Sequence, residues 1–159
     1  MSEPFTIREA ESRDAAGILA LLATAFAPYR ASYTTGAYAD TVLTAETLRE
    51  RMAAMTVLVA ADAAGRVVGS IACKVEAAGE GHIRGMAVLP DFQGSGVADS
   101  LLGHAEGELR KRGCRLVKLD TTRPLARAIR FYRRNGFCAS GAVHDFFGME
   151  LFEYRKVLG

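Results

Sequence analysis

A glycine-rich turn carries the strongest chemical signal in the sequence. It reads Gln93-Gly94-Ser95-Gly96-Val97-Ala98 and lies between a predicted strand and a long predicted helix. Its glycines permit backbone dihedrals that a Cβ would forbid, and they let a ligand come close to the backbone. The helix that follows offers unpaired N–H groups and the positive end of its dipole. This combination predicts an anion site suited to phosphate.

Two familiar nucleotide-binding motifs are excluded by the residues themselves. A dinucleotide GxGxxG fingerprint that starts at Gly94 needs a third glycine at position 99, where the chain has Asp99. A P-loop needs Gly-Lys-Ser or Gly-Lys-Thr, and neither occurs. The turn therefore predicts phosphate binding of another kind.

Basic residues are concentrated in residues 110–134. That segment holds ten Lys and Arg against one acid, Asp120, so it carries +9 while the whole chain carries +2. Such a surface favours a polyanionic ligand, although a solvated basic helix face has the same composition. Free nucleic acid is the weaker partner, because no helix-turn-helix, zinc finger or aromatic RNA-binding platform is visible. We therefore expect no nucleic-acid partner.

Length and composition describe a globular chain. Its 159 residues, half of them apolar and 24% charged, fit one domain over residues 1–159 that needs no disulfide or metal staple. No run approaches the ~18 apolar residues of a membrane span, and the N-terminus lacks the basic opening of a secretory signal. Cys73, Cys114 and Cys138 form no CxxC pair, so neither a disulfide nor a metal site is expected. We expect a cytoplasmic protein without a membrane partner.

The elements that position the turn follow from hydrophobic periodicity and turn residues. Residues 27–40 are predicted to form a loop, broken by Pro28 and Gly36. The order β-α-α-β-β-β-α-β-α-β-β predicts a mixed α/β sheet layered with helices. Strands are predicted at 5–8, 56–61, 67–75, 82–88, 115–122, 137–143 and 149–157, and helices at 12–26, 44–55, 95–112 and 124–135.

Two segments resemble motifs of the GNAT superfamily of N-acetyltransferases. Residues 86–98 resemble its acyl-CoA signature, (Gln/Arg)-x-x-Gly-x-(Gly/Ala), which Gln93, Gly96 and Ala98 satisfy. Residues 128–137, Ala-Ile-Arg-Phe-Tyr-Arg-Arg-Asn-Gly-Phe, resemble the family's Ala-x-x-x-Tyr helix that ends in Gly-Phe. Both motifs occur in the family's order, with basic residues between them.

The resemblance implies a fold and an acyl donor. The fold class is α/β (α+β), a mixed and mostly antiparallel sheet of six to seven strands with a splayed central parallel pair and about four helices. Acetyl-CoA would enter between strands 82–88 and 115–122. Backbone groups would hold its pantetheine and pyrophosphate, and the arginines of the basic helix would meet its ribose phosphate. The implied cofactor-binding residues are Ala87, Val88, Gln93, Gly94, Ser95, Gly96, Val97, Ala98, Arg127 and Arg133.

By the same resemblance, Tyr132 is the general acid that protonates the departing CoA thiolate. A phenol of ordinary pKa about 10 is protonated at neutral pH and can donate. Without the family match, residue type and spacing favour a packing role for Tyr132 beside Ile129 and Phe131. One position departs from the family pattern: many members carry Asn three residues before the motif's alanine, where this chain has Leu125.

The general base is less well determined. An amine nucleophile of pKa near 10.4 is only about 10⁻³ to 10⁻⁴ neutral at pH 7, so a base or a water relay helps. The family often uses a Glu of the fourth strand, and residues 82–88 contain none. His82 is the candidate, acting through water, because imidazole suits proton transfer near neutral pH. Glu76 and Glu80 flank the preceding turn as alternatives.

The acceptor pocket is expected between the loop after the first helix and the last hairpin. Its candidate substrate residues are Tyr29, Arg30, Tyr33 and Phe147, with Tyr38, Asp145 and Phe146 nearby. Arg30 would favour an acceptor that bears a carboxylate. The family resemblance implies transfer of acetyl from acetyl-CoA to a primary amine, on a small molecule or a peptide, by direct attack in a ternary complex. A non-catalytic acyl-CoA-binding domain and a basic nucleic-acid module stay open as alternatives, and the family resemblance allows a homodimer.

Overall fold

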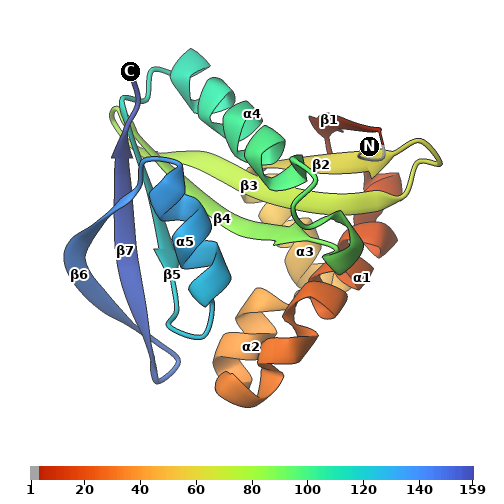
Figure 1. Ribbon diagram of the computed structural model, residues 1–159, viewed down its shortest axis with the longest axis horizontal. Helices are drawn as coiled ribbons and strands as arrows, with labels where there is room; N and C mark the ends of the chain where they lie inside the picture. The colour runs from red at the N-terminus through yellow and green to blue at the C-terminus, as the bar shows by residue number, and fades with distance from the viewer. Residues whose placement is uncertain (1–3) are drawn as a thin grey trace.

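A seven-stranded sheet forms the centre of the computed structural model, which describes residues 4–159 (Figure 1). Its strand order is β1-β2-β3-β4-β5-β7-β6, and every neighbouring pair is antiparallel except β4–β5. The predicted mixed, mostly antiparallel sheet with one central parallel pair is therefore confirmed. The strands are β1 (Phe5–Glu9), β2 (Thr56–Asp62), β3 (Val67–Ala77), β4 (Glu80–Val88), β5 (Leu116–Thr121), β6 (Cys138–Phe146) and β7 (Met149–Val157).

Five α-helices and three short 3₁₀ helices connect the strands among the described residues. The α-helices are α1 (Ala15–Phe26), α2 (Thr35–Thr41), α3 (Ala45–Ala54), α4 (Val97–Lys111) and α5 (Ala126–Arg134). The 3₁₀ helices are η1 (Ser12–Asp14), η2 (Ala27–Ser32) and η3 (Pro90–Phe92). The predicted fold class, with about four helices, is confirmed, and the structure has one further short α-helix.

The extra helix is α2, which lies where a loop over residues 27–40 was predicted. The loop prediction is wrong: η2 begins at Ala27 with Pro28 in its first turn, and α2 follows two residues after η2 ends. The Thr34 side chain accepts a hydrogen bond from the Ala37 N–H at 3.2 Å, and Ala37 is fully buried. Pro28 and Gly36 led to the loop prediction because both residues disfavour a helix interior. A proline is tolerated in the first turn of a helix, however, which is where Pro28 lies.

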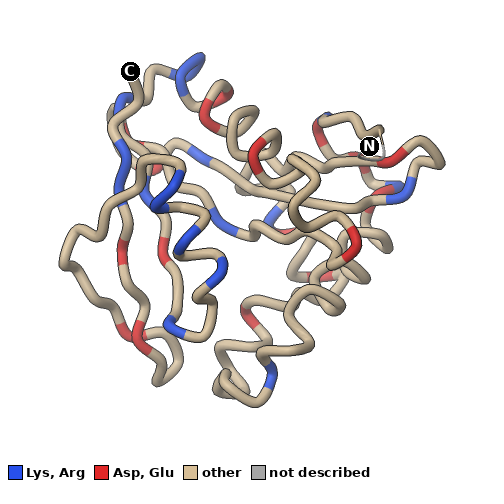
Figure 2. Tube along the Cα trace, viewed as in Figure 1, with Lys and Arg blue, Asp and Glu red and all other residues tan. Residues whose placement is uncertain are grey.

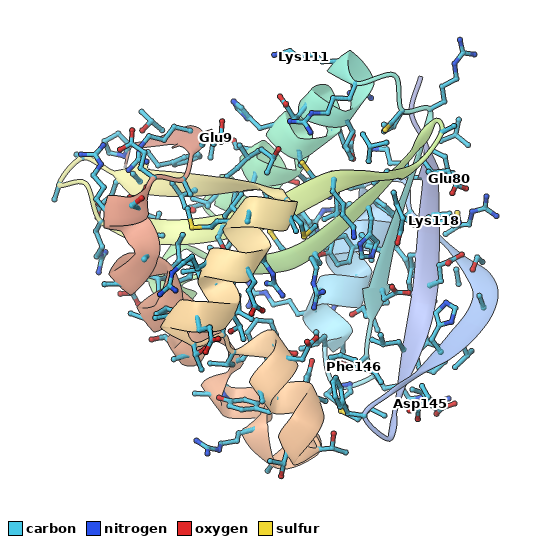
Figure 3. All side chains as sticks on the ribbon, turned by 180° about the vertical axis from the view of Figure 1, so that it is seen from behind. Glu9, Glu80, Lys111, Lys118, Asp145 and Phe146 are labelled. Atoms are coloured by element: carbon cyan, nitrogen blue, oxygen red, sulfur yellow. The ribbon has the colours of Figure 1, made fainter. Side chains whose placement is uncertain are left out.

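The helices cover both faces of the sheet. α4 and α5 pack on one face, where they share a hydrophobic core with Ile71, Ile83, Val117 and Leu119. α1 and α3 lie on the other face and pack on Val57, Val59 and Ala72. Figure 3 shows that this second face is covered by helices over one half and open over β5, β7 and β6. Neighbouring residues of one strand point to opposite faces, which is why residues 57–61 of β2 and 67–73 of β3 are all buried.

The parallel pair diverges after a short contact. β4 and β5 pair only where Glu80, Gly81 and His82 lie opposite Leu116, Val117 and Lys118. An ion pair between Lys118 Nζ and Glu80 Oε1, 3.3 Å apart, marks this closed end (Figure 3). Beyond it each strand has an edge without a strand partner on that side, and unpaired edges can bind an extended ligand.

A distortion of β4 accompanies the divergence. The β3–β4 register shifts between Ser70 and Ala72, and Gly85 takes a φ of +66° there. The Ser70 hydroxyl donates a hydrogen bond to the Gly85 carbonyl at 3.2 Å. Since a left-handed φ disfavours residues with a Cβ, Gly85 is suited to this bend.

One helical segment, Ser12–Ser32, is long and apolar enough to cross a membrane by length and composition alone. This differs from the expectation that no run approaches a membrane span. Within the segment, Ile18, Leu21 and Leu22 are buried in the core against the sheet. A core helix of a soluble protein passes the same test, so the segment is weak evidence for a membrane span.

Candidate active site

A cavity of about 840 Å³ opens at the divergence of β4 and β5. Its walls come from both strands, from the turn after β4, from α5, and from the helical segments on the opposite face of the sheet. Residues of the two predicted motifs therefore meet in one space, although up to about fifty positions separate them in the chain. Among them are Ala87, Val88, Gln93, Gly94, Gly96, Ala98, Arg127 and Tyr132.

The turn at the start of α4 presents free amide groups. Gly94 and Gly96 have φ of +80° and +91°, and a Cβ on either would meet open space. Among residues 4–159, no hydrogen bond engages the backbone N–H groups of Gly94, Gly96, Val97 or Ala98. Free amides at the start of a helix are an arrangement that favours an anion, so the geometry here is compatible with the predicted phosphate site.

Two predicted cofactor residues of this turn have side chains that face elsewhere. Val97 is fully buried, and its side chain packs against Gly69 of β3. The Ser95 hydroxyl donates to the Phe92 carbonyl. Neither residue lines the cavity. The Ser95 N–H also donates to the Phe92 carbonyl, so of these two residues only Val97 has a backbone N–H without a partner among residues 4–159.

Three arginines of α5 face the cavity: Arg127, Arg130 and Arg134. Figure 2 shows basic residues along α5 beside the gap between the strands. The predicted Arg133 is absent from the cavity lining, and its guanidinium lies 6.0 Å from the centre of the Tyr154 ring. The sequence could have distinguished these three arginines from Arg133, because a helical spacing of three and four residues places positions 127, 130 and 134 on one stripe.

Tyr132 lies at the cavity wall with its ring in the core. Its side chain is only 7% exposed and packs edge-on against Phe131 and Phe137. Burial raises the pKa of its phenol well above the usual value, so the group is protonated throughout the physiological range. Tyr132 thus combines packing contacts in the core with a place on the cavity wall. Leu125, at the N-cap of α5, lines the same cavity and offers no amide there.

His82 lies in the cavity beside a carboxylate that sequence reasoning missed. Its Nε2 is 3.5 Å from Oδ2 of Asp120. Asp120 lies on β5, two residues beyond Lys118, which is opposite His82 in the parallel pair. Its Nδ1 is buried and has no hydrogen-bond partner among the described residues. Asp120 was the single acid in the basic segment, which was the only sequence signal for it. Glu80 is engaged with Lys118 at the closed end, and neither Glu76 nor Glu80 lines the cavity.

The acceptor end is bounded by η2, α2 and the β6–β7 hairpin. The Tyr33 hydroxyl lies 3.0 Å from Oγ1 of Thr122, which ties η2 to the end of β5. Tyr29, Tyr33 and Phe146 line the cavity. Arg30 and Phe147 do not: Arg30 is exposed over the Tyr38 ring, and Phe147 is 58% exposed with its ring against Gly36 of α2. Figure 3 shows Phe146 at the hairpin tip next to α2.

Two arginines that the sequence analysis did not select line this end instead. Arg84 of β4 pairs with Asp40 of α2, with Nη2 2.9 Å from Oδ2. Arg51 of α3 reaches across Gly85 into the cavity. No local motif marks Arg51, because it reaches the site only through the packing of α3 on the sheet.

One group of potential metal ligands occurs among the described residues. Ligand atoms of Asp120, His144 and Glu153 lie within 4.8 Å of one another on the open face of β5, β6 and β7. Exposed acidic groups often gather in this way without a metal, and we assign no ion to this cluster.

The comparison with known families decides the assignment. The model of the acetyltransferase (GNAT) family matches residues 18–137, which is most of the chain and includes both motifs. The chain belongs to the GNAT family.

Curated and solved relatives agree with this GNAT assignment. The chain is 26% identical over 95 residues to N-alpha-acetyltransferase 30 of Schizosaccharomyces pombe, a match that covers 56% of this chain and 63% of that protein. It is 36% identical over 78 residues to aminoalkylphosphonate N-acetyltransferase of Salmonella typhimurium, covering 46% and 51%. The chain thus spans less than two thirds of either relative.

A solved structure matches over nearly the whole chain. It is the PaiA N-acetyltransferase of Thermoplasma acidophilum in complex with coenzyme A, with a TM-score of 0.79, 20% identity, and coverage of 97% of this chain and 99% of that one. The predicted family and fold are therefore confirmed for this GNAT chain, and coenzyme A is the ligand bound in that solved structure. The free amides of the turn and the open space above Gly94 and Gly96 fit a pyrophosphate.

Proposed function

We propose that this GNAT chain transfers an acetyl group from acetyl-CoA to a primary amine by direct attack in a ternary complex. The observation that carries the proposal is the single cavity at the β4–β5 divergence. It brings an anion-binding turn, a protonated phenol and an imidazole–carboxylate pair into one space. No cysteine lines it, so no thiol there is available to carry an acetyl group between two half-reactions.

The donor end would hold acetyl-CoA through backbone groups and arginines. The free N–H groups of Gly94 and of residues 96–98 would receive the pyrophosphate. The three arginines of α5 that line the cavity, Arg127, Arg130 and Arg134, would meet the remaining phosphate charge. Ala87 and Val88 pair with β3 on one edge, so their other edge is open to an extended pantetheine. When bound there, acetyl-CoA supplies the activated acyl group.

His82 would remove the proton from the attacking amine, directly or through water. Removing the proton from an amine of pKa near 10.4 costs roughly 4 to 5 kcal/mol at pH 7, so a base that accepts this proton helps the reaction. Asp120, with Oδ2 3.5 Å from Nε2, would hold the imidazole in place. The unpartnered Nδ1 lies on the other side of the ring.

Tyr132 would give its proton to the departing thiolate. Burial raises the pKa of the phenol, so Tyr132 still carries its proton at the pH values where the acceptor amine is neutral and can attack. A buried donor also strengthens any hydrogen bond to an anion that forms beside it.

The acceptor is proposed to be a small-molecule or peptide amine, with neither nucleic acid nor membrane as a partner. The two relatives' names indicate an alpha-amino acceptor for one and an aminoalkylphosphonate for the other, so they do not converge on one substrate. We further propose that residues 1–159 form one catalytic domain and that the protein is cytoplasmic. We also propose a homodimer that forms through the edge strand β6, and light scattering would test this oligomeric state.

An amine panel with thiol release as the readout tests the proposed function. We expect CoA release that depends on both acetyl-CoA and an amine, together with a product of mass increased by one acetyl group. Binding of acetyl-CoA without acetyl transfer to any amine would contradict it and favour a non-catalytic acyl-CoA-binding domain.

A further inference from the structure

Arg51 is a cation of the cavity without a carboxylate partner. Among residues 4–159, its guanidinium makes no hydrogen bond, and no carboxylate oxygen lies within 4.0 Å of its nitrogens. Arg84 beside it is already paired with Asp40 at 2.9 Å. Burial, with a smaller repulsion from Arg84, lowers the pKa of Arg51 to about 10, so Arg51 is still charged at neutral pH. A partly desolvated charge of this kind is stabilised by a bound counter-ion.

The fold makes room for this side chain. A Cβ at Gly85 would lie 2.9 Å from Nη1 of Arg51, so the guanidinium lies directly over the bent part of β4. Any larger residue at position 85 would compete with it for that space. The two arginines therefore reach one stretch of the cavity wall, Arg51 from α3 and Arg84 from β4.

Their position is the acceptor end and not the donor end. α3 lies on the face of the sheet opposite α4 and α5, as Figures 1 and 3 show from the two sides. The donor end has its own arginines on α5 and its own turn. Asp40 forms its ion pair with Arg84 and Asp120 lies beside His82, so Arg51 receives only a weaker, longer-range attraction from Asp40.

We propose that Arg51, assisted by Arg84, forms an anion subsite for the acceptor, so that the preferred acceptor is an amine that also carries a carboxylate or phosphonate group. A guanidinium can hold such an oxyanion through two parallel N–H···O bonds. The subsite would orient the amine toward His82 while the anionic group is held over Gly85. This inference rests on the proposed acetyltransferase function.

Matched acceptor pairs test the subsite. Amino acids are compared with their methyl esters, and aminoalkylphosphonates with the corresponding alkylamines, so that carboxylate and phosphonate form separate arms. We expect higher kcat/KM for the anionic member in at least one arm. Arg51→Gln is expected to lower kcat/KM about 10- to 100-fold for that member, with little change for its neutral partner. Arg51→Lys, which keeps the charge but not the fork, restores part of the preference.

Arg49→Gln is the matched control, because Arg49 is an exposed arginine of the same helix outside the cavity. It is expected to leave both members of each pair unchanged. Equal kcat/KM for charged and neutral acceptors in the wild type would overturn the inference while the acetyltransferase function stands. An equal loss on both members in Arg51→Gln would also overturn it.

A binding measurement separates the two proposals if no amine is acetylated. CoA-saturated protein is titrated with the same amino acids, aminoalkylphosphonates, esters and alkylamines. Binding of the anionic member that Arg51→Gln abolishes would support the subsite although acetyl transfer had failed. Absence of such binding in the wild type would overturn the subsite as well.

Discussion

At the residue scale, Tyr132 carries the sharpest mechanistic prediction. Tyr132→Phe removes one hydroxyl and keeps the ring that packs on Phe131 and Phe137. We expect kcat to fall about 10²- to 10⁴-fold, the usual contribution of a general acid, with nearly unchanged affinity for acetyl-CoA. Tyr154→Phe is the control, since Tyr154 is equally buried in the same core but does not line the cavity.

The raised pKa of Tyr132 adds a pH dependence to this prediction. A phenol donates only while it is protonated, and burial moves its deprotonation to higher pH. The wild-type kcat should therefore show no fall from loss of the acid between pH 7 and about 10, where an ordinary tyrosine begins to ionise. A steady-state pH profile measures this. A fall near pH 10 that Tyr132→Phe removes would show that the phenol is not shielded as the structure indicates.

His82 gives a prediction with the opposite pH behaviour. His82→Ala should lower the rate at pH 7, since the amine must then lose its proton unaided. The defect should shrink as the pH approaches the amine's own pKa near 10.4, where the free amine is abundant. Asp120→Asn should give a smaller defect of the same shape, because Asp120 acts through His82. A defect that is constant across pH would contradict the proton-transfer role of His82.

The sequence predicted site residues best where a backbone motif defines them. The turn at 93–98 and Tyr132 meet in the cavity, because a motif fixes their local geometry. Side chains that depend on tertiary packing were harder to predict. Arg51 and Asp120 went unselected, while Arg30, Arg133 and Phe147 lie outside the cavity lining, since local spacing does not show which way an exposed side chain faces.

At the element scale, glycines set how closely α4 approaches the sheet. A Cβ at Gly69 of β3 would lie 2.8 Å from Val97 Cγ1 and 2.9 Å from Leu101 Cδ1, both buried at the start of α4. Gly69→Ala should therefore lower the free energy of unfolding by about 1–3 kcal/mol, as overpacking does. It should also weaken acetyl-CoA binding, because the displaced helix start carries the anion-binding turn. Chemical denaturation and calorimetry measure the two effects.

Gly103→Ala is the matched control for Gly69→Ala. Gly103 lies within α4, and a Cβ there would meet open space. Alanine is a better helix former than glycine, so this variant should gain about 0.5–1 kcal/mol. Equal effects of the two substitutions would contradict the close approach at Gly69.

Helices and strands with a strong periodic pattern were predicted well, and the short elements were not. α3 begins after Thr44, whose side chain accepts a hydrogen bond from the Thr47 N–H, as the predicted helix start at 44 requires. α2 is seven residues long and sits between breaker residues, so its pattern is too short to distinguish it from a loop. It is held by contacts far along the chain, such as Asp40 with Arg84.

At the scale of the whole molecule, the fold protects two of its three cysteines. Cys73 and Cys114 are buried, and burial raises the pKa of Cys73 to about 11, while Cys138 is exposed on β6. A disulfide reagent should modify one thiol of the native protein quickly and all three after unfolding. Cys138→Ser should remove the fast reaction. Rapid modification of three thiols in the native state would contradict the packing of both faces of the sheet.

The central claim is that acetyl-CoA binds in the cavity between β4 and β5. Calorimetric titration of ligand-free protein with acetyl-CoA, with NAD as the control ligand, tests it most directly. We predict micromolar binding of acetyl-CoA alone, weakened about 10-fold or more when Arg127, Arg130 and Arg134 are all changed to Gln. The same three changes at Arg110, Lys111 and Arg115, outside the cavity, should leave affinity nearly intact. Folded protein that binds no acetyl-CoA, or equal weakening by both sets of changes, would contradict the claim.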